Sequence, residues 1–407
     1  MTNEYDQTLI LSGMRDAVLS VSFSSKAKFV SATGFAGVII WDLSCGTPVS
    51  SPQIICAPQN PKYIISASAW LYFPKYDRHI LVLGSLRGDI LLWQWDSAVN
   101  AFQRLHRIPS VNAERQVLSL DVYEREVSSG HRGRIVGATI DGCVTVWALS
   151  AVGELTQVFS CTLEILPKTV RFCPHTRDLL VFAQIGGIIL RLDHRSGDVR
   201  SRRDNGPRIM GSVALNRAAD KFVAWTGDGF QLHTLSNLEL IRTFGGHRPV
   251  VHFPKHVVFG EKDGIIIGGT DRGCGLIYNL HHNEAVQTLD YHRGGLVQHV
   301  AAITLPERHL IAIAGSTRYQ PADVVIYQKL VQKGIAQSED YEPLISSNAR
   351  KVTPQGPVLV GFYVSNTVWK VIQTSLLAIV VLGLATVFTY SNAGQWFVEV
   401  RRDILNF

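Results

Sequence analysis

Histidine is concentrated in the later part of the chain, where imidazole groups could ligate a metal ion. A metal site needs several ligands that converge at fixed spacing and are held by further partners. His252 and His256 are four residues apart, a spacing that brings side chains together on a helix but not in a strand and loop pattern. We therefore expect no metal site among these residues, which are His247, His252, His256, His281, His282, His292, His299 and His309.

Two other segments invite a chemical interpretation. Residues 264–275 are rich in glycine, but no Lys-Ser/Thr pair and no helical pattern follow, so β-turn glycines are favoured over a phosphate-binding loop. No Gly-x-Ser-x-Gly motif occurs. Three aspartates lie one or two residues before a turn glycine and are turn residues first; they are Asp141, Asp228 and Asp271. The sequence therefore predicts no catalytic residue, no cofactor and no small-molecule substrate.

The elements that would position any site are short strands. Residues 12–43 contain three runs of β-branched and aromatic residues, 18–23, 29–32 and 38–43, separated by small and polar residues. Such runs are typical of strands joined by tight turns, and the 3.6-residue helical period is absent. The segment is thus one complete β unit.

This unit resembles a WD repeat. Phe23-Ser24 matches the turn after the first strand, Ala36-Gly37 matches the second turn, and Trp41-Asp42 closes the third strand. The resemblance implies a β-propeller whose blades carry about 40–45 residues each.

Comparable strands that follow a turn recur to about residue 328. They end near Trp93, Trp147, Arg191, His233, Tyr278 and Tyr327, which with Trp41 gives seven blades rather than six. Residues 8–11 precede the first unit, and in WD propellers such a strand closes the ring by joining the last blade. We predict an all-β, seven-bladed propeller over residues 1–329, with 8–11 paired to the strand near 324–327.

A propeller surface suits protein partners. Turn residues are the natural contacts, and we select Arg87, His131, Arg132, Arg272 and Arg318. The net charge of +6 is dispersed along the chain, so no nucleic-acid partner is expected. Arg202-Arg203 resembles the paired arginines of phosphoinositide-binding propellers, but Ser201 and Asp204 replace the flanking apolar residue and glycine. A solvated strand or loop is the preferred interpretation of this pair.

The last part of the chain has a different composition. Residues 337–343 and 346–351 are polar and lack periodicity, and prolines occur at 343 and 354, which predicts a flexible linker over 330–366. Residues 371–390 are uncharged and mainly apolar, long enough to cross a bilayer as a helix. We predict a transmembrane helix at 367–391 and a short tail at 392–407. The residues assigned to the anchor are Trp369, Val371, Leu376, Leu377, Ile379, Val380, Val381, Leu382, Leu384, Val387, Phe388, Tyr390 and Trp396.

The polar N-terminus lacks the features of a secretory signal, so we expect the propeller in the cytosol and the anchor in an internal membrane, such as the endoplasmic reticulum. The function predicted is a non-catalytic, single-pass scaffold that binds other proteins. Its architecture also resembles the anchored propeller exchange factor for Sar-type GTPases, but the glycine-rich cation loop of that family is missing from the first blade. A buried C-terminal helix and an unanchored scaffold are the remaining alternatives.

Overall fold

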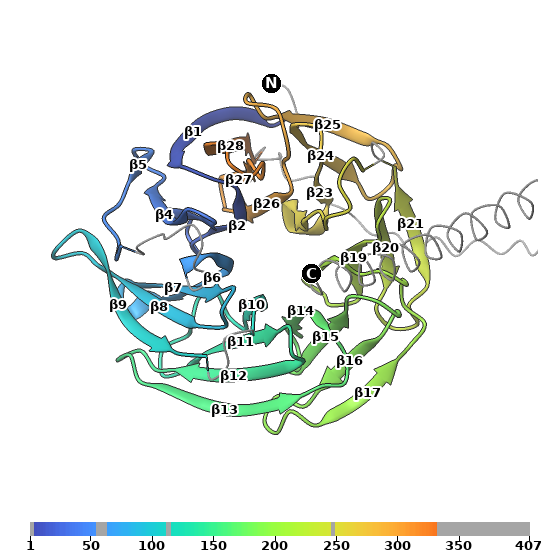
Figure 1. Ribbon diagram of the computed structural model, residues 1–407, viewed down its shortest axis with the longest axis horizontal. Coiled ribbons are helices and arrows are strands. Elements are labelled where there is room, and N and C mark those ends of the chain that lie inside the picture. Colours follow the sequence, from blue (N-terminus) through green and yellow to red (C-terminus); the bar gives the residue numbers. More distant parts are fainter. Residues whose placement is uncertain (1–3, 54–62, 111–114, 246–248, 332–407) are drawn as a thin grey trace, which may run out of the picture. The chain divides into compact units, whose positions relative to one another are not determined.

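In the computed structural model, residues 4–53, 63–110, 115–245 and 249–331 are described. These residues form seven antiparallel sheets of four strands each, which follow one another around a ring (Figure 1). This architecture confirms the predicted all-β, seven-bladed propeller. The predicted linker, transmembrane helix and tail lie outside the described residues. The described ranges contain no helix with the length and apolarity that crossing a bilayer demands.

The strands of the first four blades follow one another from the inner to the outer edge of each sheet. They are β2 (Val18–Phe23), β3 (Phe29–Gly34), β4 (Gly37–Asp42), β5 (Thr47–Pro48); β6 (Ile65–Phe73), β7 (Arg78–Ser85), β8 (Ile90–Asp96), β9 (Ala101–Ile108); β10 (Val117–Val122), β11 (Gly133–Thr139), β12 (Cys143–Leu149), β13 (Leu155–Thr162); and β14 (Pro167–Phe172), β15 (Leu179–Ala183), β16 (Ile189–Leu192), β17 (Val199–Arg203).

The last three blades follow the same order, except that the outer strand of the seventh comes from the N-terminal end. They are β18 (Ser212–Leu215), β19 (Lys221–Trp225), β20 (Phe230–Thr234), β21 (Leu240–Phe244); β22 (Val257–Gly260), β23 (Ile265–Gly269), β24 (Cys274–Asn279), β25 (Ala285–Asp290); and β26 (His299–Thr304), β27 (Arg308–Ala314), β28 (Ala322–Leu330), β1 (Asp6–Met14). Short 3-10 helices occur at η2 (Pro74–Tyr76) and η3 (Glu261–Asp263).

The ring is closed by β1, which pairs antiparallel with β28. Leu11 lies opposite Val324, Ile10 opposite Val325 and Leu9 opposite Ile326. This pairing confirms the role predicted for residues 8–11. Because β1 pairs with the edge of β28 and supplies the fourth, outer strand of the last blade, closure of the ring by the N-terminal end is part of the fold.

The hydrophobic core consists of seven buried clusters, one between each pair of neighbouring blades. The cluster between the last and first blades joins Leu11, Trp41 and Val324, and the next joins Phe29 to Trp70 and Trp93. The other five clusters repeat this arrangement around the ring. Since each blade buries both of its faces against neighbours, the ring is stabilised as a whole rather than blade by blade.

The strands that were expected to end each blade are in fact the third strands, and a fourth strand follows on the outside of each. These outer strands were missed because they contribute few buried residues. All five residues of β17, for example, are exposed, including Arg202 and Arg203. That exposure confirms the solvated strand proposed for the arginine pair. The segment 264–275 forms the hairpin of β23 and β24, as its glycines predicted.

Candidate functional site

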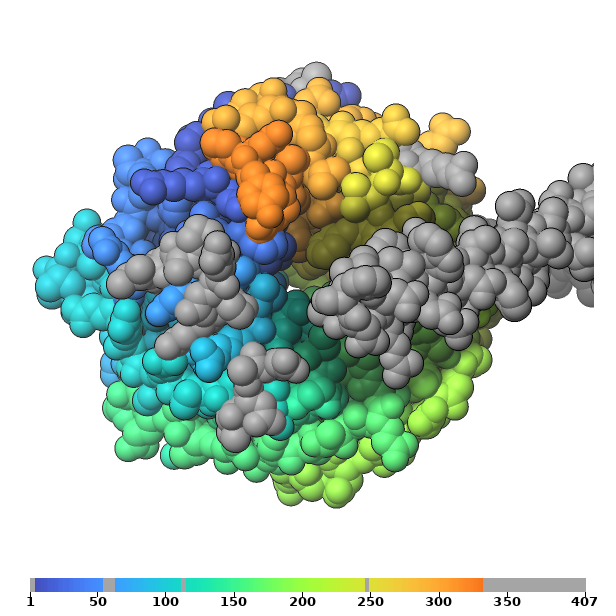
Figure 2. Space-filling view, in the orientation of Figure 1, coloured from blue at the N-terminus to red at the C-terminus, as the bar shows by residue number. Residues whose placement is uncertain are grey.

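The propeller has two faces that differ in the loops they carry. In an antiparallel sheet successive turns lie at opposite ends, so the turns between second and third strands share a face with the connections between blades. We call this side the upper face; it carries, for example, the turns at 86–89, 270–273 and 315–321. The lower face carries the turns between first and second strands, such as 123–132. Figure 2 shows the ring face-on, with the blades in sequence order around it.

The five predicted contact residues are divided between these faces. Arg87, Arg272 and Arg318 lie in second-to-third strand turns on the upper face, whereas His131 and Arg132 lie in the β10–β11 connection on the lower face. Three of the five are thus brought to one side of the disc, but from blades two, six and seven. They do not form one compact cluster.

The three upper arginines differ in their surroundings. Arg87 and Arg272 are exposed, and neither guanidinium forms an ion pair with another described residue. Arg318 is partly buried over the Phe35 ring, 3.2 Å from its centroid, and lies 3.9 Å from the Asp16 carboxylate. Arg87 and Arg272 are therefore available to an acidic partner, while Arg318 already has intramolecular partners.

Exposed apolar side chains accompany the arginines on the upper face. Ile185 is 65% exposed and Val250 68%, and Ile209 is 39% exposed. Ile185 and Ile209 are backbone partners in an isolated bridge, so they lie side by side. Exposed apolar residues and unpaired arginines, both of which occur on this face, are common features of protein-binding surfaces.

A buried ion pair supports this face in the sixth blade. Lys255 Nζ lies 2.9 Å from Asp271 Oδ1, and the two side chains are 5% and 1% exposed. Asp271 Oδ2 also accepts hydrogen bonds from the backbone NH groups of Val250 and Val251. Burial by itself would raise the pKa of Asp271, but these bonds and Lys255 outweigh it and lower the pKa. Asp271 lies in a turn, as predicted, and it also holds the loop that carries Val250 in place.

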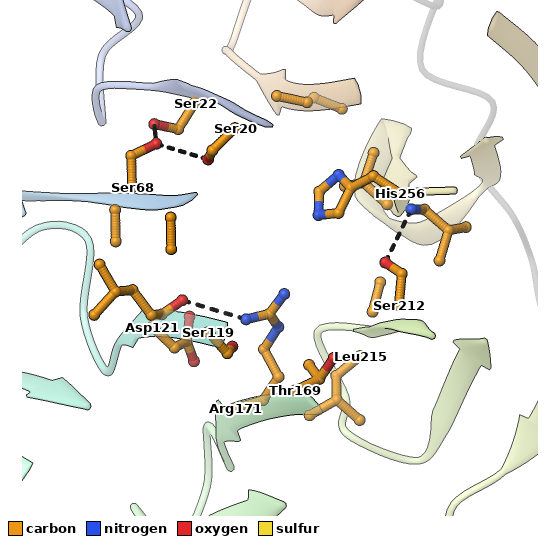
Figure 3. A pocket seen from close by; sticks show the side chains of 18 of the residues that line it. Ser20, Ser22, Ser68, Ser119, Asp121, Thr169, Arg171, Ser212, Leu215 and His256 are labelled. Atoms are coloured by element: carbon orange, nitrogen blue, oxygen red, sulfur yellow. Dashed lines mark hydrogen bonds between the residues drawn. The ribbon is translucent and has the colours of Figure 1, made fainter. Parts of the chain in front are cut away.

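A central channel of about 730 Å³ runs along the inner strands of all seven blades. On the side of the first two blades its wall is neutral and polar: the hydroxyl groups of Ser20 and Ser22 lie 2.9 and 2.8 Å from that of Ser68 (Figure 3). On the opposite side, Ser212 accepts a hydrogen bond from the Val257 NH group at 3.3 Å. These hydroxyls can both donate and accept hydrogen bonds.

The wall formed by blades three to seven carries basic side chains. Arg171 points into the channel (Figure 3) and donates from Nη1 to the Val170 carbonyl at 3.1 Å. Lys168 lies three residues earlier in β14 at a β-bulge, and burial lowers its pKa. Desolvation also lowers the pKa of Arg125. The carboxylate of Asp121 opposes this shift, while the neighbouring charges of Arg171 and Arg217 add to it. Positive charges from three blades thus meet inside the ring.

Two histidines lie beside this basic group. The rings of His256 and His299 have centroids 6.0 Å apart, and His256 Nδ1 is 2.7 Å from the Val300 carbonyl. Burial, followed by the charges of nearby basic residues, lowers the pKa of His256 to about 4, and burial, His256 and Lys168 lower that of His299 to about 3. Both rings are consequently neutral near pH 7. His299 Nε2 is buried and has no hydrogen-bond partner among the described residues.

One group outside the channel has the composition of a cation site. Ligand atoms of Asp178, Asp193 and His194 lie within 4.8 Å of one another. Arg191 Nε is 2.8 Å from Asp178 Oδ2, and Arg200 pairs with both carboxylates. Because arginines already neutralise these acids, the arrangement is best explained as a structural ion network of the fourth blade.

No protein-family model matches this sequence, and comparison with curated proteins finds no significant match. The fold itself defines the class: this protein is a seven-bladed β-propeller, an architecture consistent with the WD-like pattern of the sequence.

The channel site was missed by sequence reasoning. Its members stand at Arg125, Lys168, Arg171, Arg217, His256 and His299, too far apart along the chain to form a motif. The sequence of β14, Pro-Lys-Thr-Val-Arg-Phe, could have indicated the site. This inner strand has two basic residues, whereas the inner strands β2 and β6 carry serines and no basic residue.

Proposed function

We propose that this protein is a non-catalytic interaction scaffold, held at the cytosolic side of an internal membrane by its C-terminal segment. The propeller is the rigid binding part, and the upper face is the side that receives a protein partner. Tethering to a membrane raises the effective concentration of the scaffold for partners at that surface.

One observation carries the proposal for the upper face. Arg87 and Arg272 are exposed there without ion-pair partners among the described residues, and Ile185, Ile209 and Val250 are exposed on the same face. A partner with an acidic rim and an apolar centre would complement both features, since charge steers encounter and apolar contact supplies affinity. The propeller fold fits this role because its turns present side chains from several blades on one rigid disc.

Charge reversal tests this assignment. We expect Arg87→Glu combined with Arg272→Glu to remove most proteins labelled by a proximity-labelling enzyme fused to the full chain in cells. His131→Glu combined with Arg132→Glu, on the lower face, is the matched control and should leave the labelled set unchanged. The proposal would be contradicted if only the lower-face variant lost its labelled proteins. It would also be contradicted if neither variant changed the set of labelled proteins.

The membrane part of the proposal has a separate test. The sequence of residues 371–390 supports an integral helix, so the full chain should stay in the membrane pellet after extraction at alkaline pH. A chain ending at Lys329 should move to the supernatant. Release of the full chain would exclude an integral anchor and leave the unanchored scaffold. The exchange-factor alternative stays a prediction.

A further inference from the structure

We propose that the central channel binds a small, multiply charged oxyanion, such as a compound that carries two or more phosphate groups. This inference goes beyond the scaffold function and departs from the expectation that the protein has no small-molecule ligand. It rests on the shape of the channel, on the excess of basic over acidic residues in its lining, and on the absence, among the described residues, of close ion pairs that would neutralise that excess.

The channel has the size of a ligand site. Its volume of about 730 Å³ falls within the range of roughly 300–1,000 Å³ that is usual for small-molecule pockets. The inner strands around it are held by contacts between neighbouring blades, so the wall is already formed without a ligand. A ligand would therefore bind at little cost in ordering the protein.

The charge of the lining is unbalanced. Three acidic residues, Asp121, Glu126 and Asp263, face a larger basic set. No ion pair within 4.0 Å connects the two groups in the described residues. Asp121 instead accepts a hydrogen bond from the Phe172 NH group at 2.8 Å, and Asp263 accepts one from the Arg217 backbone at 2.8 Å. The basic lining residues are Arg125, Lys168, Arg171, Arg217 and Lys262.

Asp121 offsets part of the charge of Arg125 and Arg171, but the basic residues remain in excess. Cations in excess that converge in one site repel one another, and an anion between them would remove that repulsion. Arg171 is well placed for this role, because bonds to the carbonyl groups of Leu120, Val170 and Val213 fix its guanidinium in the channel. Arginine and lysine are the side chains that most often bind phosphate oxygens. The neighbouring serine and threonine hydroxyls can donate further hydrogen bonds to the same oxygens.

The depth of the basic lining favours more than one anionic group. Lys168, His256 and His299 lie at the starts of their inner strands, towards the upper face, whereas Arg125 and Arg217 follow the ends of theirs, towards the lower face. A strand advances about 3.3 Å per residue, so one phosphate cannot reach both levels. A chain of phosphate groups, or a ring that bears several, can contact both.

Isothermal titration of the full chain in detergent, at about 150 mM salt with tripolyphosphate as the probe, tests the site. We expect saturable binding of one molecule and weaker binding of inorganic phosphate. Lys168→Gln combined with Arg217→Gln should weaken tripolyphosphate binding at least about tenfold, because charged contacts are lost. Neither side chain has a hydrogen bond or ion pair with another described residue, so the variant should fold, which its thermal unfolding midpoint will verify.

Arg87→Gln combined with Arg272→Gln is the matched control, since it removes the same charge from the upper face and should leave the affinity within twofold. Equal weakening by both double variants would show only general charge attraction and would overturn the proposal. So would the absence of saturable binding up to about 1 mM, or a channel variant that binds like the parent. Tighter binding of a hexaglutamate peptide than of tripolyphosphate would also overturn it, in favour of an acidic protein segment in the channel. Because no partner protein is present, failure here leaves the proposed scaffold function standing.

Discussion

Leu11→Asp is expected to destabilise the propeller by about 4 kcal/mol or more, which is a large part of the stability of an ordinary domain. Leu11 is 1% exposed and belongs to the cluster that joins the first and last blades. A carboxylate at this position would have to be buried without a partner, or β1 would have to leave β28 and open the ring. Urea unfolding of the full chain in detergent, followed by tryptophan fluorescence, measures the effect.

Ile10→Asp provides the control for this prediction. Ile10 is the adjacent residue of the same strand, but its side chain is 45% exposed on the other side of the sheet. The same substitution there should change the free energy of unfolding by no more than about 1 kcal/mol. If the two variants were equally destabilised, the effect would come from strand propensity or added charge, and closure by β1 would not be the reason.

Asp271→Ala should cost about 3–5 kcal/mol, because it leaves the ammonium group of Lys255 buried without its carboxylate. It also removes the acceptor for the NH groups of Val250 and Val251, so the adjacent loop of the upper face should loosen. Chemical denaturation measures the loss, and hydrogen exchange near Val250 reports the loop. Asp228→Ala, in the equivalent turn of the fifth blade, removes an exposed carboxylate and should cost less than about 0.5 kcal/mol.

The Asp271 effect should also depend on pH. The pKa of this carboxyl is lowered in the folded protein. Its contribution is therefore fully present above the ordinary value of about 3.9 and is lost as the pH falls through the lowered folded value. The difference in unfolding free energy between the parent and Asp271→Ala should shrink only in strong acid. A difference that is constant down to pH 2 would mean that cavity formation, rather than charge, causes the destabilisation.

The part of the fold that follows from local sequence was predictable. The run from Val38 to Leu43 needs only its own β-branched residues and a preceding glycine to form a strand, and the same pattern marks the third strand of the other blades. The closing strand was also predictable, because β1 has no neighbour of its own in sequence. The outer strands were harder to predict. Residues such as Arg202 and Arg203 in β17 are exposed, so the strand has no hydrophobic pattern that the sequence could reveal.

The candidate sites divide in the same way. The sequence placed Arg87, Arg272 and Arg318 in turns, but the alternation of turns between the two ends of each sheet decided that they share a face and that His131 and Arg132 do not. The channel site was not predicted, because its residues stand on different blades, and the two basic residues of β14 are the one local signal for it named above.

The amino-acid sequence by itself determined the blade count, the third strand of each blade and the partner of the first strand, because those features depend on residues within one blade or on an unpaired edge. The tertiary structure alone decided that Arg125, Arg171 and Arg217 meet around one cavity. They belong to three successive blades of the chain, and they converge only because closure of the ring turns the inner strand of every blade towards the same axis.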